Sequence, residues 1–176
     1  MVDGLVGSYL MNHTLFAAAR ELVERARRDG QSGRQADSDE LDRLARALGA
    51  YLPDWYRSLL ATVPLIGLEL GVVASGLEAD DEISWLEWLD PGSIHAESLD
   101  LYPGIAVLEY GYLCVGRCAH GTGDQYFLKT SAGDDPPLVQ IAHDAGANAD
   151  LILQNGVMEI ATTLSGFFAD AKTSLA

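Results

Sequence analysis

The sequence predicts an α+β protein: a mostly antiparallel sheet of about five or six strands, flanked by helices. Three strand-like runs, residues 113–119, 125–130 and 138–141, follow one another closely and are joined by turn residues. Gly121 and Gly123 can take the positive φ that a tight hairpin requires, so these runs form an antiparallel meander. Helix-like segments precede and follow the strands instead of alternating with them, which is the α+β pattern.

Three helices are expected before the first strand. Asn12 or Thr14 caps the first, which ends before Gly30. The second begins at Asp37 or Ser38 and stops at Gly49, and the third covers about residues 54–62, after a proline. Apolar residues recur at helical spacing in the first two and predict their buried faces: Leu15, Ala19, Leu22, Val23 and Ala26, then Leu41, Leu44, Ala45 and Leu48.

The rest of the chain carries further strand-like and helix-like runs. Residues 65–73 fit either a strand or a buried helix, because two glycines weaken both interpretations. Residues 83–89 and 105–110 are predicted strands, separated by a short helical segment over residues 91–100. A last helix is predicted over residues 157–171, where apolar residues form one stripe.

The chain has the length of one ordinary domain. A polar linker, residues 29–38, separates the first helix from the second, so residues 1–38 are expected to form a separable N-terminal unit and residues 39–172 the main domain. The first helix either docks on this domain or mediates a homodimer.

Charge is distributed unevenly along the chain. The net charge is −15: residues 1–57 hold eight Lys/Arg against nine Asp/Glu, and residues 58–176 hold three against seventeen. Such a field repels nucleic acid and anionic lipid and attracts basic partners, although acidity alone also serves solubility. No apolar run reaches the length of a membrane span, no basic leader precedes an apolar run at the N-terminus, and the two cysteines cannot form a disulfide scaffold. We expect a soluble, cytoplasmic protein that binds neither nucleic acid nor membranes.

Neither a metal centre nor a catalytic constellation is predicted. Cys114 and Cys118 would lie roughly 13 Å apart on a strand rising about 3.3 Å per residue, too far to share one zinc ion. His120 and His143 could meet across the meander, but two histidines make a weak site, and the nearby aspartates cap turns. The serines lie outside a nucleophile-elbow motif, and no phosphate-binding glycine loop is present. We therefore expect a protein that is not an enzyme and binds no cofactor.

Aromatic residues give the stronger indication of function. Trp85 and Trp88 are three residues apart, so on a strand they face opposite sides, and one should reach solvent or a partner. Together with the acidic loop before them they form the predicted partner-binding site: Asp80, Asp81, Glu82, Trp85 and Trp88. Tyrosines in or beside the strands, which either pack the sheet or anchor a partner, are Tyr102, Tyr110, Tyr112 and Tyr126.

Several segments, in this order, carry a family resemblance. The SUKH superfamily has an opening helix that residues 52–60 (LPDWYRSLL) resemble. Its core signature is similar to residues 123–128 (GDQYFL), followed by 137–139 (PLV) and His143-Asp144, and its closing helix is similar to residues 160–167. One departure is residues 63–67 (VPLIG), where the family often has Asn-Gly-Gly. That superfamily includes bacterial immunity proteins and a yeast cell-wall-synthesis regulator.

The resemblance implies a SUKH-like single domain that binds proteins. One implied function is an immunity protein that neutralises a cognate basic toxin, such as a nuclease. The alternative is an intracellular adaptor or regulator of the cell-wall-regulator type. The acidic part of the chain agrees with the first, because opposite fields speed the encounter with a basic partner.

Overall fold

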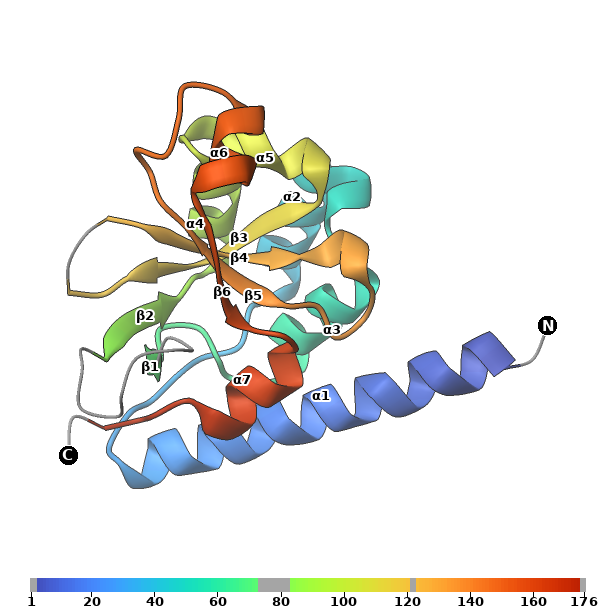
Figure 1. The fold of residues 1–176 in the computed structure, drawn as a ribbon. Coiled ribbons are helices and arrows are strands. Elements are labelled where there is room, and N and C mark those ends of the chain that lie inside the picture. The colour runs from blue at the N-terminus through green and yellow to red at the C-terminus, as the bar shows by residue number, and fades with distance from the viewer. Residues whose placement is uncertain (1–2, 73–82, 121–122, 175–176) are drawn as a thin grey trace.

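A six-stranded antiparallel sheet in sequential order forms the centre of the molecule (Figure 1). The computed structural model describes residues 3–72, 83–120 and 123–174, and the side chains of the first helix from His13 onward. Each strand pairs with its sequence neighbours, so the predicted α+β class and antiparallel sheet are confirmed. The strands are β1 (Glu69–Val72), β2 (Ser84–Trp88), β3 (Tyr112–Cys118), β4 (Gln125–Lys129), β5 (Leu138–Ile141) and β6 (Val157–Ala161).

Helices lie at two opposite ends of this sheet (Figure 1). At the lower end in that view are α1 (Asp3–Arg28) and α7 (Leu164–Asp170), with α3 (Asp54–Thr62) beside them. At the upper end lie α4 (Pro91–His95), the π-helical turn η2 (Ala96–Asp100), α5 (Gly104–Val107) and α6 (Ala149–Asn155). The helix α2 (Ser38–Leu48) packs on α4, and 3₁₀ turns are η1 (Gly49–Tyr51), η3 (Leu108–Tyr110) and η4 (Thr130–Ala132).

The core is centred on the fully buried Trp88 of β2. Its ring centroid lies 5.4 Å from that of Phe168 on α7 and 6.5 Å from that of Tyr56 on α3. One side chain therefore joins the sheet to two helices that are more than a hundred residues apart in sequence. Burying an aromatic ring in this way stabilises the fold by about 1.5–3 kcal/mol relative to exposure.

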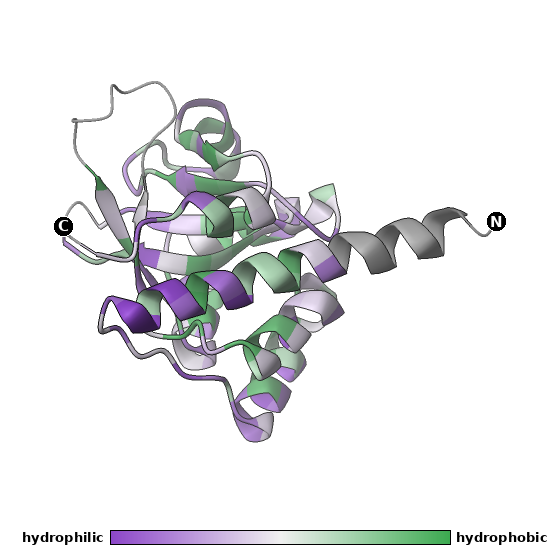
Figure 2. Ribbon diagram, turned by 90° about the horizontal axis from the view of Figure 1, so that it is seen from below, coloured by the Kyte–Doolittle hydropathy of each residue, from purple (hydrophilic) through white to green (hydrophobic). Residues whose placement is uncertain are grey.

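The first helix docks on the core. All five residues of its predicted apolar stripe are buried, and they belong to the same cluster as Trp88 and Phe168. Arg25 also donates to the carbonyl oxygens of Phe168 and Ala171, at 2.7 and 3.3 Å, where the last carbonyls of α7 lack helical partners. Figure 2 looks onto α1 and shows mostly hydrophilic residues in its last turns on the side away from the core. Separability of residues 1–38 stays a prediction, but this packing argues against it.

Local sequence signals place several elements where they are found. Asp37 caps α2 in a capping box: it accepts from the amide of Glu40 at 2.8 Å, and Glu40 accepts from the amide of Asp37 at 2.9 Å. Pro53 precedes α3, Gly49 ends α2, and Gly123 has φ +83° at the turn into β4. The three strands of the meander lie within a residue or so of the predicted bounds. Gly121 lies outside the described residues.

Four expectations are corrected or resolved. The first helix begins at Asp3, well before Thr14, and residues 65–73 contain a strand, β1. The predicted strand over residues 105–110 is wrong: α5 and η3 occupy it. The predicted helix over residues 157–171 is wrong in its first half, because residues 157–161 form β6 and only α7 is helical.

Truncating the buried face of α1 should destabilise the whole protein. Leu22→Ala removes a fully buried side chain and should lower the free energy of unfolding by about 2–5 kcal/mol, as measured by chemical denaturation. The neighbouring exposed Glu21→Ala is the matched control and should change the free energy of unfolding by less than about 0.5 kcal/mol.

Because the apolar face of α1 is buried in the core, a chain beginning at Ala36 should melt at a lower temperature than the full chain. Equal stability of the Leu22 and Glu21 variants would show that α1 is not part of the core.

Candidate functional site

Both tryptophans of the predicted partner site are buried. Trp88 is fully buried and Trp85 is 6% exposed, so the expectation that one of them reaches solvent is wrong. The two do face opposite sides of β2: Trp88 lies in the central cluster, whereas Trp85 pairs with Gly71 across the strands. An ideal Cβ on Gly71 would lie 3.2 Å from the Trp85 ring, so the glycine makes room for it. Asp80, Asp81 and Glu82 lie outside the described residues.

The cysteines lie on one strand without contact to each other. Cys114 is fully buried, and burial raises the pKa of its thiol well above the ordinary value. Cys118 is half-buried at the end of β3, and both thiols are free. A buried, protonated thiol behaves as a small apolar side chain.

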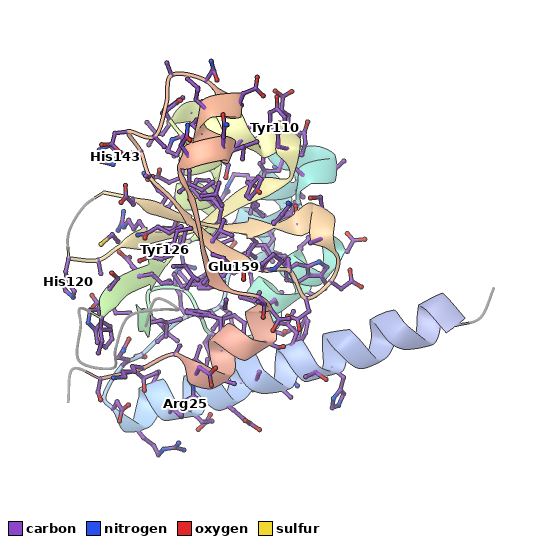
Figure 3. All side chains as sticks on the ribbon, viewed as in Figure 1. Arg25, Tyr110, His120, Tyr126, His143 and Glu159 are labelled. Atoms are coloured by element: carbon purple, nitrogen blue, oxygen red, sulfur yellow. The ribbon has the colours of Figure 1, made fainter. Side chains whose placement is uncertain are left out.

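The two histidines pair with different carboxylates instead of with each other. His143 Nδ1 lies 2.8 Å from Asp124 Oδ1, and the same oxygen accepts from the His143 amide at 3.1 Å. His120 Nε2 lies 3.4 Å from Glu69 Oε2. Figure 3 shows both imidazoles at the margin of the molecule, well separated. The Asp124 contact raises the pKa of His143 above its ordinary value, with Asp144 adding to the field.

Over the described residues, no group of three or more His, Cys, Asp or Glu side chains converges as a metal site would require. One hollow, about 380 Å³, lies between α2 and α4. Three of its polar groups have partners within the protein: Glu40 is paired with Arg34, Asp90 caps α4, and His95 lies 3.4 Å from Asp100. Arg43 lines the hollow as well. The hollow is therefore a junction between two helices, and the residues that line it include no serine, threonine or cysteine nucleophile beside a base.

The tyrosines divide into buried and exposed pairs. Tyr126 is fully buried and Tyr112 is 8% exposed, so both pack the sheet. Tyr102 and Tyr110 are 40% and 44% exposed and lie before and after α5. Figure 3 shows Tyr110 at the α5–α6 end of the molecule, opposite Arg25 at the α1–α7 end. Tyr102 and Tyr110 are therefore exposed features of the upper end.

Four exposed apolar side chains gather at this upper end. Leu101, Tyr102 and Ile105 are 40–55% exposed and lie in the turn that leads into α5, which is closed by the Ile105 amide donating to the Leu101 carbonyl. The Tyr102 hydroxyl donates to the Gly146 carbonyl, in the loop before α6. An ideal Cβ on Gly146 would lie 2.4 Å from Leu151 Cβ, so Leu151 of α6, 41% exposed, lies against the same loop. We call these four residues the apical patch.

The segments that carry the apical patch are acidic throughout. Residues 91–111 and 142–156 contain no lysine or arginine, and their carboxylates are Glu97, Asp100, Glu109, Asp144 and Asp150. The histidines in these segments, His95 and His143, lie against Asp100 and Asp124. The patch is thus a group of exposed apolar side chains on segments whose fixed charges are all carboxylates, a composition that suits docking of a basic partner.

Tyr102 and Tyr110 were among the tyrosines expected from the sequence, whereas Leu101, Ile105 and Leu151 were not predicted as site residues. The strand predicted over residues 105–110 put Ile105 in a sheet, where an isoleucine would pack inward. One signal was available: Asn148 caps α6 by accepting from the Leu151 amide at 3.0 Å, and an asparagine before a short apolar run is a typical helix start.

In the part of the chain that the structure describes, no helix combines the length and apolarity needed to cross a bilayer. Comparison with known protein families, with curated proteins and with solved structures finds no match to this chain.

The Asp124–His143 contact should make part of the stability depend on pH. Because the pKa of His143 is raised in the folded protein, its contribution is fully present below about pH 6.5 and is lost as pH rises through the folded-state pKa. Asp124→Asn keeps an oxygen for the His143 amide but removes the charge, so NMR titration should show a lower His143 pKa in the variant. An unchanged pKa would mean that the contact does not persist in solution.

Proposed function

We propose that this protein is a non-catalytic binding module that takes a basic protein at the apical patch, and that it acts as an immunity protein towards a toxin. The observation that carries the proposal is the location of the patch: four exposed apolar side chains within segments that hold five carboxylates and no lysine or arginine. Exposed apolar groups are costly for solubility unless they serve an interface, and a field of one sign around them suits steering of an oppositely charged partner.

The two components of this surface have separate physical roles. Apolar and tyrosine side chains at the centre of an interface lower the dissociation rate, because their burial accounts for most of the binding energy. Carboxylates at the rim act over longer distances and raise the association rate with a cationic partner. The patch has both, in the arrangement expected of an inhibitor that must find its target quickly.

A non-catalytic role is supported by how the reactive side chains are used. Each of the candidate bases, His120 and His143, lies against a carboxylate at the margin of the molecule, and Cys114 is buried. Asp124 takes only Nδ1 of His143 and holds the ring at the margin of the molecule. A cysteine nucleophile must be accessible as its thiolate, and the buried Cys114 is not. These groups have structural explanations and need no catalytic one.

The toxin-neutralising role comes from the SUKH resemblance of residues 52–60, 123–128 and 137–139, which implies immunity proteins among the relatives. A nuclease toxin presents a basic cleft for nucleic acid, and an acidic inhibitor surface is its natural complement. The expected partner is therefore a domain rich in Lys and Arg, and its binding to this chain would block access of an anionic substrate.

A photo-crosslinking amino acid at position 105 should capture such a partner from the host lysate. Tyr51 on η1, 42% exposed, is the matched control position, because it is similarly accessible but lies outside the patch. Leu101→Ala/Ile105→Ala should weaken the captured complex by about 2–4 kcal/mol in calorimetry, whereas Tyr51→Ala should leave it unchanged.

Growth measurements complete the test. Expression of the captured protein alone should inhibit growth, co-expression of the wild-type chain should restore it, and the double variant should restore it poorly. Equal capture from positions 105 and 51, or capture of an acidic protein, would contradict the proposal. A captured protein that does not inhibit growth would assign the adaptor role instead.

A further inference from the structure

The two edges of the sheet differ in how far the chain pairs their outward main-chain groups. At β1, the Gln31 side chain donates to the Glu69 carbonyl and accepts from its amide, both at 2.8 Å. At the next outward position, Gly71 and Lys172 exchange both main-chain bonds, at 2.8 and 3.1 Å. The outward main-chain groups of Glu69 and Gly71 are therefore paired within the molecule, which blocks strand addition there.

At β6, the pairing pattern shows which main-chain groups point outward. The Ala142 amide donates to the Gly156 carbonyl at 3.0 Å, and Met158 is opposite Gln140 in the register. Hydrogen-bonded pairs alternate along an antiparallel ladder, so Gly156 and Met158 bond to β5. The amides and carbonyls of Val157 and Glu159 then point away from β5, and among the described residues no hydrogen bond is made to either.

The side chains of β6 leave the same stretch accessible. Met158 is 45% exposed, and its neighbour Glu159 is exposed as well. Successive residues of a strand face opposite sides of the sheet, so both faces are open at this point. Figure 3 shows Glu159 on β6 near the middle of the molecule, clear of α6 and α7.

We infer that the outer edge of β6 accepts an extended, cationic segment of a partner protein as a seventh strand. Between Lys129 and Lys172 the chain has no lysine or arginine, and its carboxylates are Asp134, Asp135, Asp144, Asp150, Glu159 and Asp170. A strand carrying Lys or Arg opposite Glu159 gains a favourable cross-strand pair in addition to the main-chain bonds.

A second copy of this chain fits the edge poorly. Antiparallel pairing of β6 with itself about a two-fold axis at Glu159 would place the two carboxylates directly opposite each other, and in any register each copy carries a net charge of −15. Like charges directly opposite destabilise a strand pair, so the charge of this edge selects a basic partner over self-association.

The edge is continuous with the apical patch along the chain. Leu151 lies on α6, and α6 leads through Gly156 directly into β6. The inference rests on the proposed function only for the identity of the partner. A basic protein bound at the apical patch would bring a nearby segment of its own chain next to β6. Strand addition itself can be tested without that partner.

Amide hydrogen exchange of the wild-type chain with a synthetic peptide tests this inference. The probe is Lys-Val-Lys-Val-Lys-Val with blocked ends, and Glu-Val-Glu-Val-Glu-Val is its matched control. At about ten times the dissociation constant, the Lys peptide should slow exchange of the Val157 and Glu159 amides roughly tenfold, because only the free chain exchanges. The Glu peptide should leave both amides unchanged.

Two variants separate the main-chain contribution from the charge. Glu159→Pro removes one outward amide without removing a bond to β5, and proline is tolerated on edge strands. It should abolish the protection of Val157, whereas Glu159→Gln should only weaken it. Absence of protection at Val157 and Glu159 in the wild-type chain, or protection at Glu69 and Gly71 instead, would overturn the inference. These exchange measurements use no residue of the apical patch, so this test can fail or succeed independently of the test of the proposed function.

Discussion

The burial of Trp88 between the sheet and two helices is the constraint on which the rest of the structure depends. Its indole lies against Phe168 and within ring-contact distance of Tyr56, so β2, α7 and α3 must be in place together. The docking of α7 in turn provides the surface on which α1 packs, and Arg25 caps its last carbonyls. One side chain thus links a strand and two helices that lie far apart in the sequence, as expected of a cooperative core.

This constraint gives the molecule two unlike ends. At the α1–α7 end, polar groups are tied to one another: Gln31 bonds Glu69 and Thr173, and the Thr173 hydroxyl donates to Asp29. The opposite end has exposed leucine, isoleucine and tyrosine side chains on segments whose fixed charges are carboxylates, and its helix α6 leads into the open edge strand β6. Binding capacity is thus concentrated where the chain has not used its own groups, which is the physical basis for proposing an interaction module.

Much of the fold could be predicted because its signals are local. The capping box at Asp37, the proline before α3 and the glycine turn before β4 each act within a few residues. β6 was missed because its strand state comes from pairing with β5, and the apolar stripe of residues 157–171 hides the Thr163 cap that begins α7. The run that forms α5 is too short for its apolar spacing to distinguish a helix from a strand. Its helical state comes with close tertiary packing: a Cβ on Gly104 would lie 1.8 Å from the Glu97 carbonyl oxygen. Only the acidic and aromatic character of the candidate site could be predicted. Which side chains are exposed depends on the tertiary packing, which the local sequence does not show.

If the acidic, apolar upper end attracts and holds a basic protein, the encounter of the two proteins should depend on ionic strength. The most direct measurement is the association rate constant of the captured partner as ionic strength rises from about 50 to about 500 mM, where the Debye length falls from roughly 14 to 4 Å. We expect a steep fall in the association rate constant with a nearly constant dissociation rate constant, and a weaker salt dependence when Asp100, Glu109 and Asp150 are neutralised. An association rate that ignores both salt and these substitutions would contradict it.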